Sequence, residues 1–163
     1  MELRDVDGVR FVRLEPLAYQ TAEANGDPYD DNWLVIDGAA RSDDEQWTFR
    51  EPCLLVGEAR ALGDWLRSVA ESTAATMATD VDGNLAPTTE HLEPNLGFGV
   101  VGFENDRVTL RVFLWLESGP ASVRDSIDDS ELEWFMDLTV TRDDLRAAAA
   151  DWTTQLQRFP VRT

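Results

Sequence analysis

The chain has 163 residues, of which 43% are apolar, so it can bury the core of one folded domain rather than remain disordered. Thirty-two acidic residues against fourteen basic ones, all of them arginine, give a formal net charge of −18. Such a charge repels nucleic acids and anionic membranes, which argues against both as partners, and it attracts a basic protein. It also fits a role in solubility alone, and that alternative stays open.

Strands dominate the first part of the chain. Alternating apolar residues and turn signals predict strands over residues 9–19, 33–36 and 46–50. In the first of them, Pro16 indicates an edge position or a bulge. The dipeptide at 37–38 predicts the end of the second strand, and the acidic turn at 42–45 predicts a hairpin to the third.

An amphipathic helix is predicted to begin near residue 57. Glu58 lies near its start, where a carboxylate suits the positive end of the helix dipole. The apolar positions recur on one helical face and comprise Ala59, Leu62, Trp65, Leu66 and Val69. That face is predicted to join the core.

Residues 73–90 differ in composition from the segments on either side. Small and polar residues dominate, with no apolar period. This composition predicts a flexible surface loop rather than a domain boundary, because the strands after it need partners from before it.

Strands resume in the second half of the chain. Alternation predicts them over residues 96–103, 107–117 and 132–140. One face of the middle strand is aliphatic and predicts core, whereas its mixed face is predicted to pack under a helix. Thr141 predicts the N-cap of a last helix that carries Trp152 on its apolar face. Trp134 is also predicted to be a core residue.

The predicted order is therefore roughly βββ-α-βββ-α. Strand follows strand without regular βα alternation, which predicts an α+β fold with mostly antiparallel sheets of about six to seven strands. A sandwich-like arrangement is one form of it. We predict a single domain over residues 1–163, with 73–90 as its flexible loop.

Three features predict a cytoplasmic protein. No apolar run reaches the roughly 18 residues that cross a bilayer, and residues 1–5 contain no apolar signal segment. The one cysteine, Cys53, excludes an internal disulfide and fits a reducing compartment. Its apolar neighbours favour a buried structural thiol over a reactive one.

No motif predicts catalysis, a cofactor or a metal. The run Asp80–Gly83 resembles the start of a calcium loop, but the glycine comes too early and position 12 is His91 instead of glutamate. His91 is the only histidine, too few for a zinc site with Cys53. Carboxylate pairs are so numerous that none of them indicates an acid–base site. The sequence therefore predicts no enzyme, no cofactor and no metal site.

Acidic residues in two turns are the candidate binding residues. They lie outside the apolar faces and comprise Asp43, Asp44, Glu45, Asp125, Asp128 and Asp129. Only Arg41 and Arg124 are basic residues near them in sequence. We predict that they contact a basic partner. The alternative is that they are ordinary solvated turn residues.

Several short segments resemble those of the WapI-family immunity proteins, in the same order and at similar spacing. They are Tyr29–Leu34, Glu51–Leu55, Glu93–Leu96, Leu116–Ser118 and Phe159–Pro160. Residues 70–91 depart from the family by being longer than its usual connection. The resemblance implies a small cytosolic protein of bacterial contact-dependent toxin systems that neutralises a nuclease toxin attacking tRNA. It supplies no family binding residues that can be placed on this chain.

The sequence thus favours a non-catalytic acidic binding protein whose partner is basic, with a nuclease toxin domain as the partner that the resemblance implies. An acidic soluble domain of unknown cellular role, whose charge serves only solubility, is the alternative. An enzyme on a small α+β scaffold is a third reading.

Overall fold

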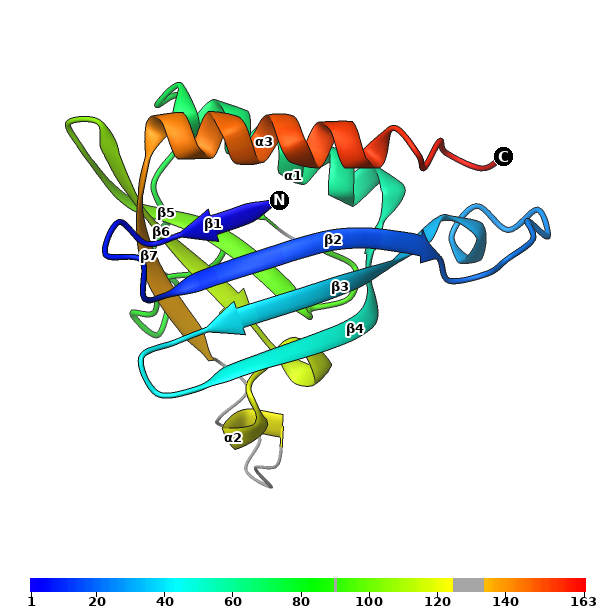
Figure 1. Ribbon diagram of the computed structural model, residues 1–163, viewed down its shortest axis with the longest axis horizontal. Helices are drawn as coiled ribbons and strands as arrows, with labels where there is room; N and C mark the ends of the chain where they lie inside the picture. Colours follow the sequence, from blue (N-terminus) through cyan, green and yellow to red (C-terminus); the bar gives the residue numbers. More distant parts are fainter. Residues whose placement is uncertain (90, 125–133) are drawn as a thin grey trace.

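The computed structural model describes residues 1–89, 91–124 and 134–163 (Figure 1). Four strands form one antiparallel sheet in the order β1 (Glu2–Arg4), β2 (Phe11–Tyr19), β3 (Trp33–Arg41) and β4 (Gln46–Leu55). Three strands form the second antiparallel sheet in the order β5 (Leu96–Glu104), β6 (Arg107–Leu114) and β7 (Phe135–Thr141). The long helices are α1 (Val56–Ala70) and α3 (Arg142–Leu156). Short helical turns are η1 (Asp30–Asn32), η2 (Leu116–Ser118) and α2 (Ala121–Arg124).

The predicted α+β class with mostly antiparallel sheets is confirmed. In Figure 1, α1 and α3 lie together along one side of the molecule, and the two sheets lie below them. The sequence missed β1, whose three residues pair with β2 from Phe11 to Arg13 and are too few to show a period. Among the described helices, none is long and apolar enough to cross a membrane.

The predicted end of a strand at residues 37–38 is wrong. β3 continues through both positions to Arg41 and pairs along its whole length with β4. Gly38 faces Phe49 across the sheet, and a β-carbon on Gly38 would overlap the buried Phe49 ring. The glycine is therefore a point where an aromatic ring lies against the backbone, and not a turn residue.

Pro16 marks a bulge, as predicted. The register between β2 and β3 shifts between Pro16 and Ala18. Pro16 also lies beyond the part of β2 that pairs with β1, so its missing N–H leaves no ladder bond unmade. Its carbonyl accepts a hydrogen bond from the Arg158 guanidinium at 2.6 Å, which ties β2 to the chain after α3.

Both long helices begin with side chains that satisfy free backbone N–H groups. The Glu58 carboxylate accepts from the N–H of Leu55 at 2.8 Å and from that of Leu92 at 2.6 Å. The Thr141 hydroxyl accepts from the N–H of Asp144 at 3.1 Å, which confirms the predicted N-cap. Glu58 thus fixes the start of α1 and also holds a segment 34 residues away.

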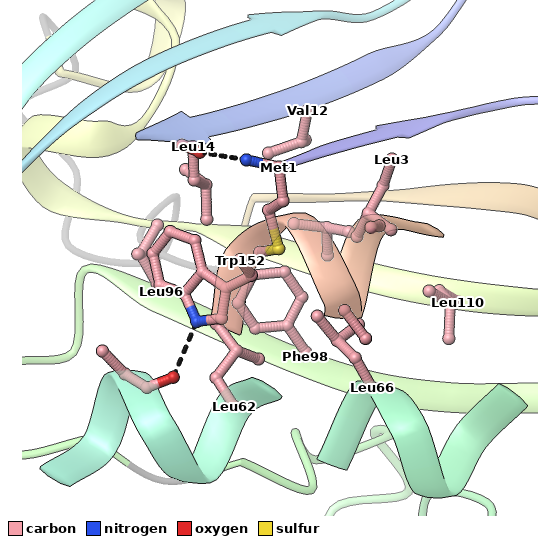
Figure 2. Packing of buried hydrophobic residues seen from close by; sticks show 14 of the residues in the cluster. Met1, Leu3, Val12, Leu14, Leu62, Leu66, Leu96, Phe98, Leu110 and Trp152 are labelled. Carbon is pink, nitrogen blue, oxygen red and sulfur yellow. Dashed lines mark hydrogen bonds between the residues drawn. The ribbon is translucent and has the colours of Figure 1, made fainter. Parts of the chain in front are cut away.

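The core is one cluster that receives side chains from both sheets and both long helices. Figure 2 shows Trp152 of α3 between α1 and the strands, with its Nε1–H donating to the Ala59 carbonyl of α1 at 2.7 Å. Trp65 and Trp134, predicted as core, are only partly buried and pack against the edge of the cluster. Their rings lie where the apolar faces meet solvent. Periodicity alone therefore overestimated how far these two side chains are buried.

The segment 73–89 contains no strand or helix beyond an isolated bridge between Thr79 and Leu85. Its two ends hydrogen bond to the outer edge of β5. The N–H of Met77 donates to the Val100 carbonyl at 2.8 Å, and that of Thr88 to the Phe98 carbonyl at 2.8 Å. The flexibility predicted for residues 73–90 stays a prediction, now with two anchoring points.

Amide hydrogen exchange should be fast in the middle of this segment and slower at its two ends. Amides of residues 80–85 should exchange fast, because their hydrogen bonds stay within one local turn and residues 80–84 are exposed. The N–H groups of Met77 and Thr88 should be slower, because both donate to β5. Exchange resolved by residue in NMR spectra measures this, with β6 as the protected reference. Equal protection of 80–85 and β6 would contradict the prediction of a flexible loop.

Candidate functional site

The acidic turn between β3 and β4 is held in a defined shape by Ser42. The Ser42 hydroxyl accepts from the N–H groups of Asp44 and Glu45, at 3.3 Å and 3.2 Å. The N–H of Ser42 in turn donates to the Glu45 carbonyl at 2.9 Å. Asp43 and Asp44 are exposed and Glu45 is partly exposed. The turn therefore presents three carboxylates to solvent on a backbone that its own hydrogen bonds fix.

A groove of about 510 Å³ lies beside this turn. Its lining joins the three acids to Arg10, Ser122 and residues 134–137 at the start of β7. The Arg10 guanidinium lies 3.0 Å from an Asp5 carboxylate oxygen and 3.9 Å from one of Asp43. Arg10 therefore offsets part of the negative charge of the turn. The sequence does not indicate this ion pair, because Arg10 and Asp43 lie far apart in the chain.

An aromatic ring borders the same groove. Phe135 is 43% exposed, and the Arg111 guanidinium lies 3.7 Å from the centre of its ring. Arg111 also forms two hydrogen bonds to Asp137, at 2.8 Å and 3.0 Å. The face of β6 predicted to pack under a helix carries this ion pair instead. The arrangement holds Phe135 in place as an exposed apolar surface among charges.

The second acidic cluster, Asp125, Asp128 and Asp129, lies outside the described residues. The described chain just before it is α2, which touches the first turn, because the Ser122 hydroxyl donates to a Glu45 carboxylate oxygen at 2.5 Å. The structure thus places Asp43, Asp44 and Glu45 together in one turn and leaves the other three candidates as a prediction.

Two residues of the first family-like segment have structural roles. The Asp31 carboxylate is buried and accepts from the N–H groups of Asn25 at 2.9 Å and Gly26 at 2.8 Å. The Asn32 side chain exchanges two hydrogen bonds of 2.9 Å with the backbone of Arg162. Asp31 thus folds the loop before η1, and Asn32 fastens the end of the chain to it.

Ser118 of another family-like segment joins three parts of the chain. Its hydroxyl donates to the Asn95 carbonyl, and its own carbonyl accepts from the Trp47 indole at 2.9 Å. The N–H of Trp115 donates to the same Asn95 carbonyl at 3.0 Å. Two of the family-like segments, Glu93–Leu96 and Leu116–Ser118, therefore meet in space, although they lie apart in sequence.

Cys53 is fully buried, as predicted for a structural thiol. Burial raises the pKa of this thiol from 9.0 to about 12, and the nearby carboxylates of Glu51, Glu117 and Glu93 act in the same direction against a weak hydrogen bond from Asn95. The thiol is therefore neutral at physiological pH.

The Cys53 thiol should react with an aromatic disulfide reagent at pH 8 about 100-fold more slowly in the native protein than in denaturant, because it is both buried and neutral. The fold should also lose stability as pH rises from 9 towards 12, because the unfolded thiol ionises in that range and the folded one does not. Absorbance at the reagent's product band measures the first effect. Reaction at the unfolded rate would contradict it.

The candidate metal ligands, including His91, lie within the described parts of the chain. Within residues 1–89, 91–124 and 134–163, no group of three His, Cys, Asp or Glu side chains could hold a metal ion. Burial lowers the pKa of His91, partly opposed by Glu58. Neither ring nitrogen of His91 has a hydrogen-bond partner among the described residues.

Aromatic residues are enriched at protein–protein interfaces, and charged groups around them guide association, so the groove with Phe135 and the acidic turn has features of a protein-binding surface. The sequence model of the immunity protein WapI-like family matches residues 3–160. The chain therefore belongs to this family of immunity proteins, and the resemblance seen in the short segments is confirmed. No curated protein and no solved structure matches the chain. Membership of an immunity family indicates a toxin-neutralising binding role.

Proposed function

We propose that this protein neutralises a basic nuclease toxin domain in the cytoplasm by covering the surface with which the toxin holds nucleic acid. Family membership supports the neutralising role. The net charge of −18 supports a basic partner, because nucleases present positive surfaces to phosphates. An acidic inhibitor occupies such a surface with fast and salt-sensitive association. The protein acts as a binding partner and carries out no reaction itself.

The observation that carries the proposal is the acidic turn beside the groove. Ser42 fixes the backbone that presents Asp43 and Asp44, so little order remains to be gained on binding. Phe135 adds an exposed ring within the same groove, and buried aromatic contacts supply much of the energy of protein interfaces. Charge would then guide the encounter, while the ring and its surroundings would slow dissociation.

Asp125, Asp128 and Asp129 belong to the proposed surface on two grounds. They follow α2 directly in sequence, and Ser122 of α2 contacts Glu45 of the first turn. The two acidic clusters would then act as one negative surface towards the toxin.

The test uses a nuclease toxin domain identified by sequencing the genes next to this protein's gene. Cleavage of tRNA by the purified domain should stop when the immunity protein is present in equimolar amount. Calorimetry should show binding that weakens at least about tenfold between about 50 and about 200 mM salt. An unrelated nuclease toxin domain serves as control and should stay active. Undiminished cleavage at a saturating excess would overturn the proposal.

The alternative that the charge serves only solubility gives a different result. Replacing the six candidate acids by Asn or Gln would then lower solubility without changing the affinity for the toxin domain. Under our proposal the same replacement weakens binding and reduces its salt dependence.

A further inference from the structure

A second groove, away from the acidic turn, lies where the family-like segments converge. It has a volume of about 380 Å³ and is lined from η1, β3, β4 and the segments before β5 and at η2. Four of its lining residues are acids, namely Asp30, Glu51, Glu93 and Glu117. No arginine lines it, and none of the four acids forms an ion pair within the described parts of the chain. The groove therefore concentrates uncompensated negative charge.

Asn95 lies in the same lining and carries a buried acceptor with no donor. The residue is only 5% exposed, and its side-chain oxygen has no hydrogen-bond partner among the described residues. Its amide nitrogen makes a weak contact of 3.9 Å with the Cys53 sulfur. Its backbone is fixed, because its N–H donates to Glu93 and its carbonyl accepts from Trp115. A buried oxygen without a donor is costly, so it points to a ligand that supplies an N–H group.

The arrangement of the acids favours an extended cation over a metal ion. In the described residues, no three carboxylate, thiol or imidazole groups come close enough to hold a metal. The four acids therefore line the groove, and no three of them meet at one point. A guanidinium has five N–H donors spread over a plane, which suits several separated acceptors. The partly buried ring of Trp33 also lines the groove and offers a face for such a plane.

The electrostatics agree with this geometry. Besides burial, Glu51, Glu117 and Glu93 each raise the pKa of the Cys53 thiol, which contacts the lining residue Asn95. Three carboxylates from three different segments thus act on one region. A cation placed there would interact with all of them.

We propose that this groove binds one arginine side chain of the partner protein. The inference rests on the proposed function for the identity of the partner, since a basic toxin supplies such side chains. The groove would be a second contact point, apart from the acidic turn. It would select a side chain with several N–H donors. The groove also gives a binding role to the region where the family-like segments meet.

Acetyl-arginine-amide is the probe for the groove, with the neutral acetyl-citrulline-amide as its matched control. In NMR titrations of the full chain, the arginine probe should shift the side-chain amide of Asn95 and the indole of Trp33. The citrulline probe should shift them much less. The triple variant Glu51→Gln, Glu93→Gln and Glu117→Gln should weaken arginine binding at least about tenfold. A second triple variant with the same charge change elsewhere, Glu71→Gln, Asp82→Asn and Glu104→Gln, should bind like wild type.

Asn95→Leu separates ligand binding from structure. Because the substitution removes a costly unpartnered oxygen and only one weak contact of the amide nitrogen, this variant should fold without loss of thermal stability and still lose arginine binding. A large loss of stability with arginine binding retained would assign Asn95 a structural role and overturn the inference. Equal shifts with arginine and citrulline would overturn it too.

Failure of this inference is distinguishable from failure of the proposed function. A toxin domain that binds and is inhibited equally by wild type and by the groove variant leaves the proposed function standing and removes the groove from it. A groove that binds arginine selectively, in a protein that does not inhibit the toxin domain, keeps the groove and removes the nuclease partner.

Discussion

Replacing Trp152 with alanine should lower the free energy of unfolding by about 3–5 kcal/mol, a large part of the roughly 5–15 kcal/mol that stabilises a domain. The indole is fully buried, and its N–H donates to the Ala59 carbonyl (Figure 2). The substitution removes apolar contacts with both sheets, leaves a cavity and breaks a link between α3 and α1. Urea unfolding followed by far-UV circular dichroism measures the change.

Two further variants define the cause of this loss. Trp152→Phe keeps most of the apolar volume and loses the hydrogen bond, so it should cost about half as much. Val81→Ala truncates a fully exposed side chain and should change stability by less than about 0.5 kcal/mol. A loss below about 1 kcal/mol for Trp152→Ala would contradict the central position of this residue.

Reversing the charge of the six candidate acids should slow association with the toxin domain by about 10- to 100-fold at low salt. The rates of the variant should also depend less on salt than those of wild type, while dissociation changes less. The physical reason is that these groups act on the approaching partner before contact. Folding should stay intact, because the six acids lie outside the apolar faces predicted from the sequence and charges outside the core contribute little to stability. Stopped-flow association rates over a salt series measure the effect.

Separate variants measure the contribution of each acidic cluster to the association rate. One variant reverses Asp43, Asp44 and Glu45, and another reverses Asp125, Asp128 and Asp129. A control variant reverses the exposed acids Glu71, Asp82 and Glu104, which lie outside both turns and change the net charge by the same amount. If the turn variants slow association no more than the control, recognition depends on total charge and not on these turns.

Long periodic elements could be predicted from the sequence because their signals are local. The face of α1, the alternation along β6 and the Thr141 cap each depend on residues within a few positions of one another. β1 has too few residues to show a period. The end of β3 was misplaced because Gly38 looks like a turn residue, whereas its role is set by the Phe49 ring on the neighbouring strand.

The candidate site was predictable only in part for a similar reason. The acidic turn at 42–45 is visible as a run of charges. Its groove is formed by Arg10, Ser122 and Phe135, which lie far apart in sequence and are brought together by folding. The same holds for the groove around Asn95, whose missing donor can be recognised only when every neighbour is placed.

The segment 73–89 has a consequence for the solution behaviour of the protein. β5 is an edge strand, and exposed edges pair with strands of other molecules and start aggregation. The outward carbonyls of Phe98 and Val100 are occupied by N–H groups of this segment, and the N–H of Phe98 donates to the Thr89 hydroxyl at 3.0 Å. Shortening the segment at its exposed residues 80–84, while keeping the buried Met77, would loosen this cover and expose the edge. The segment 73–89 thus also protects this edge against self-assembly.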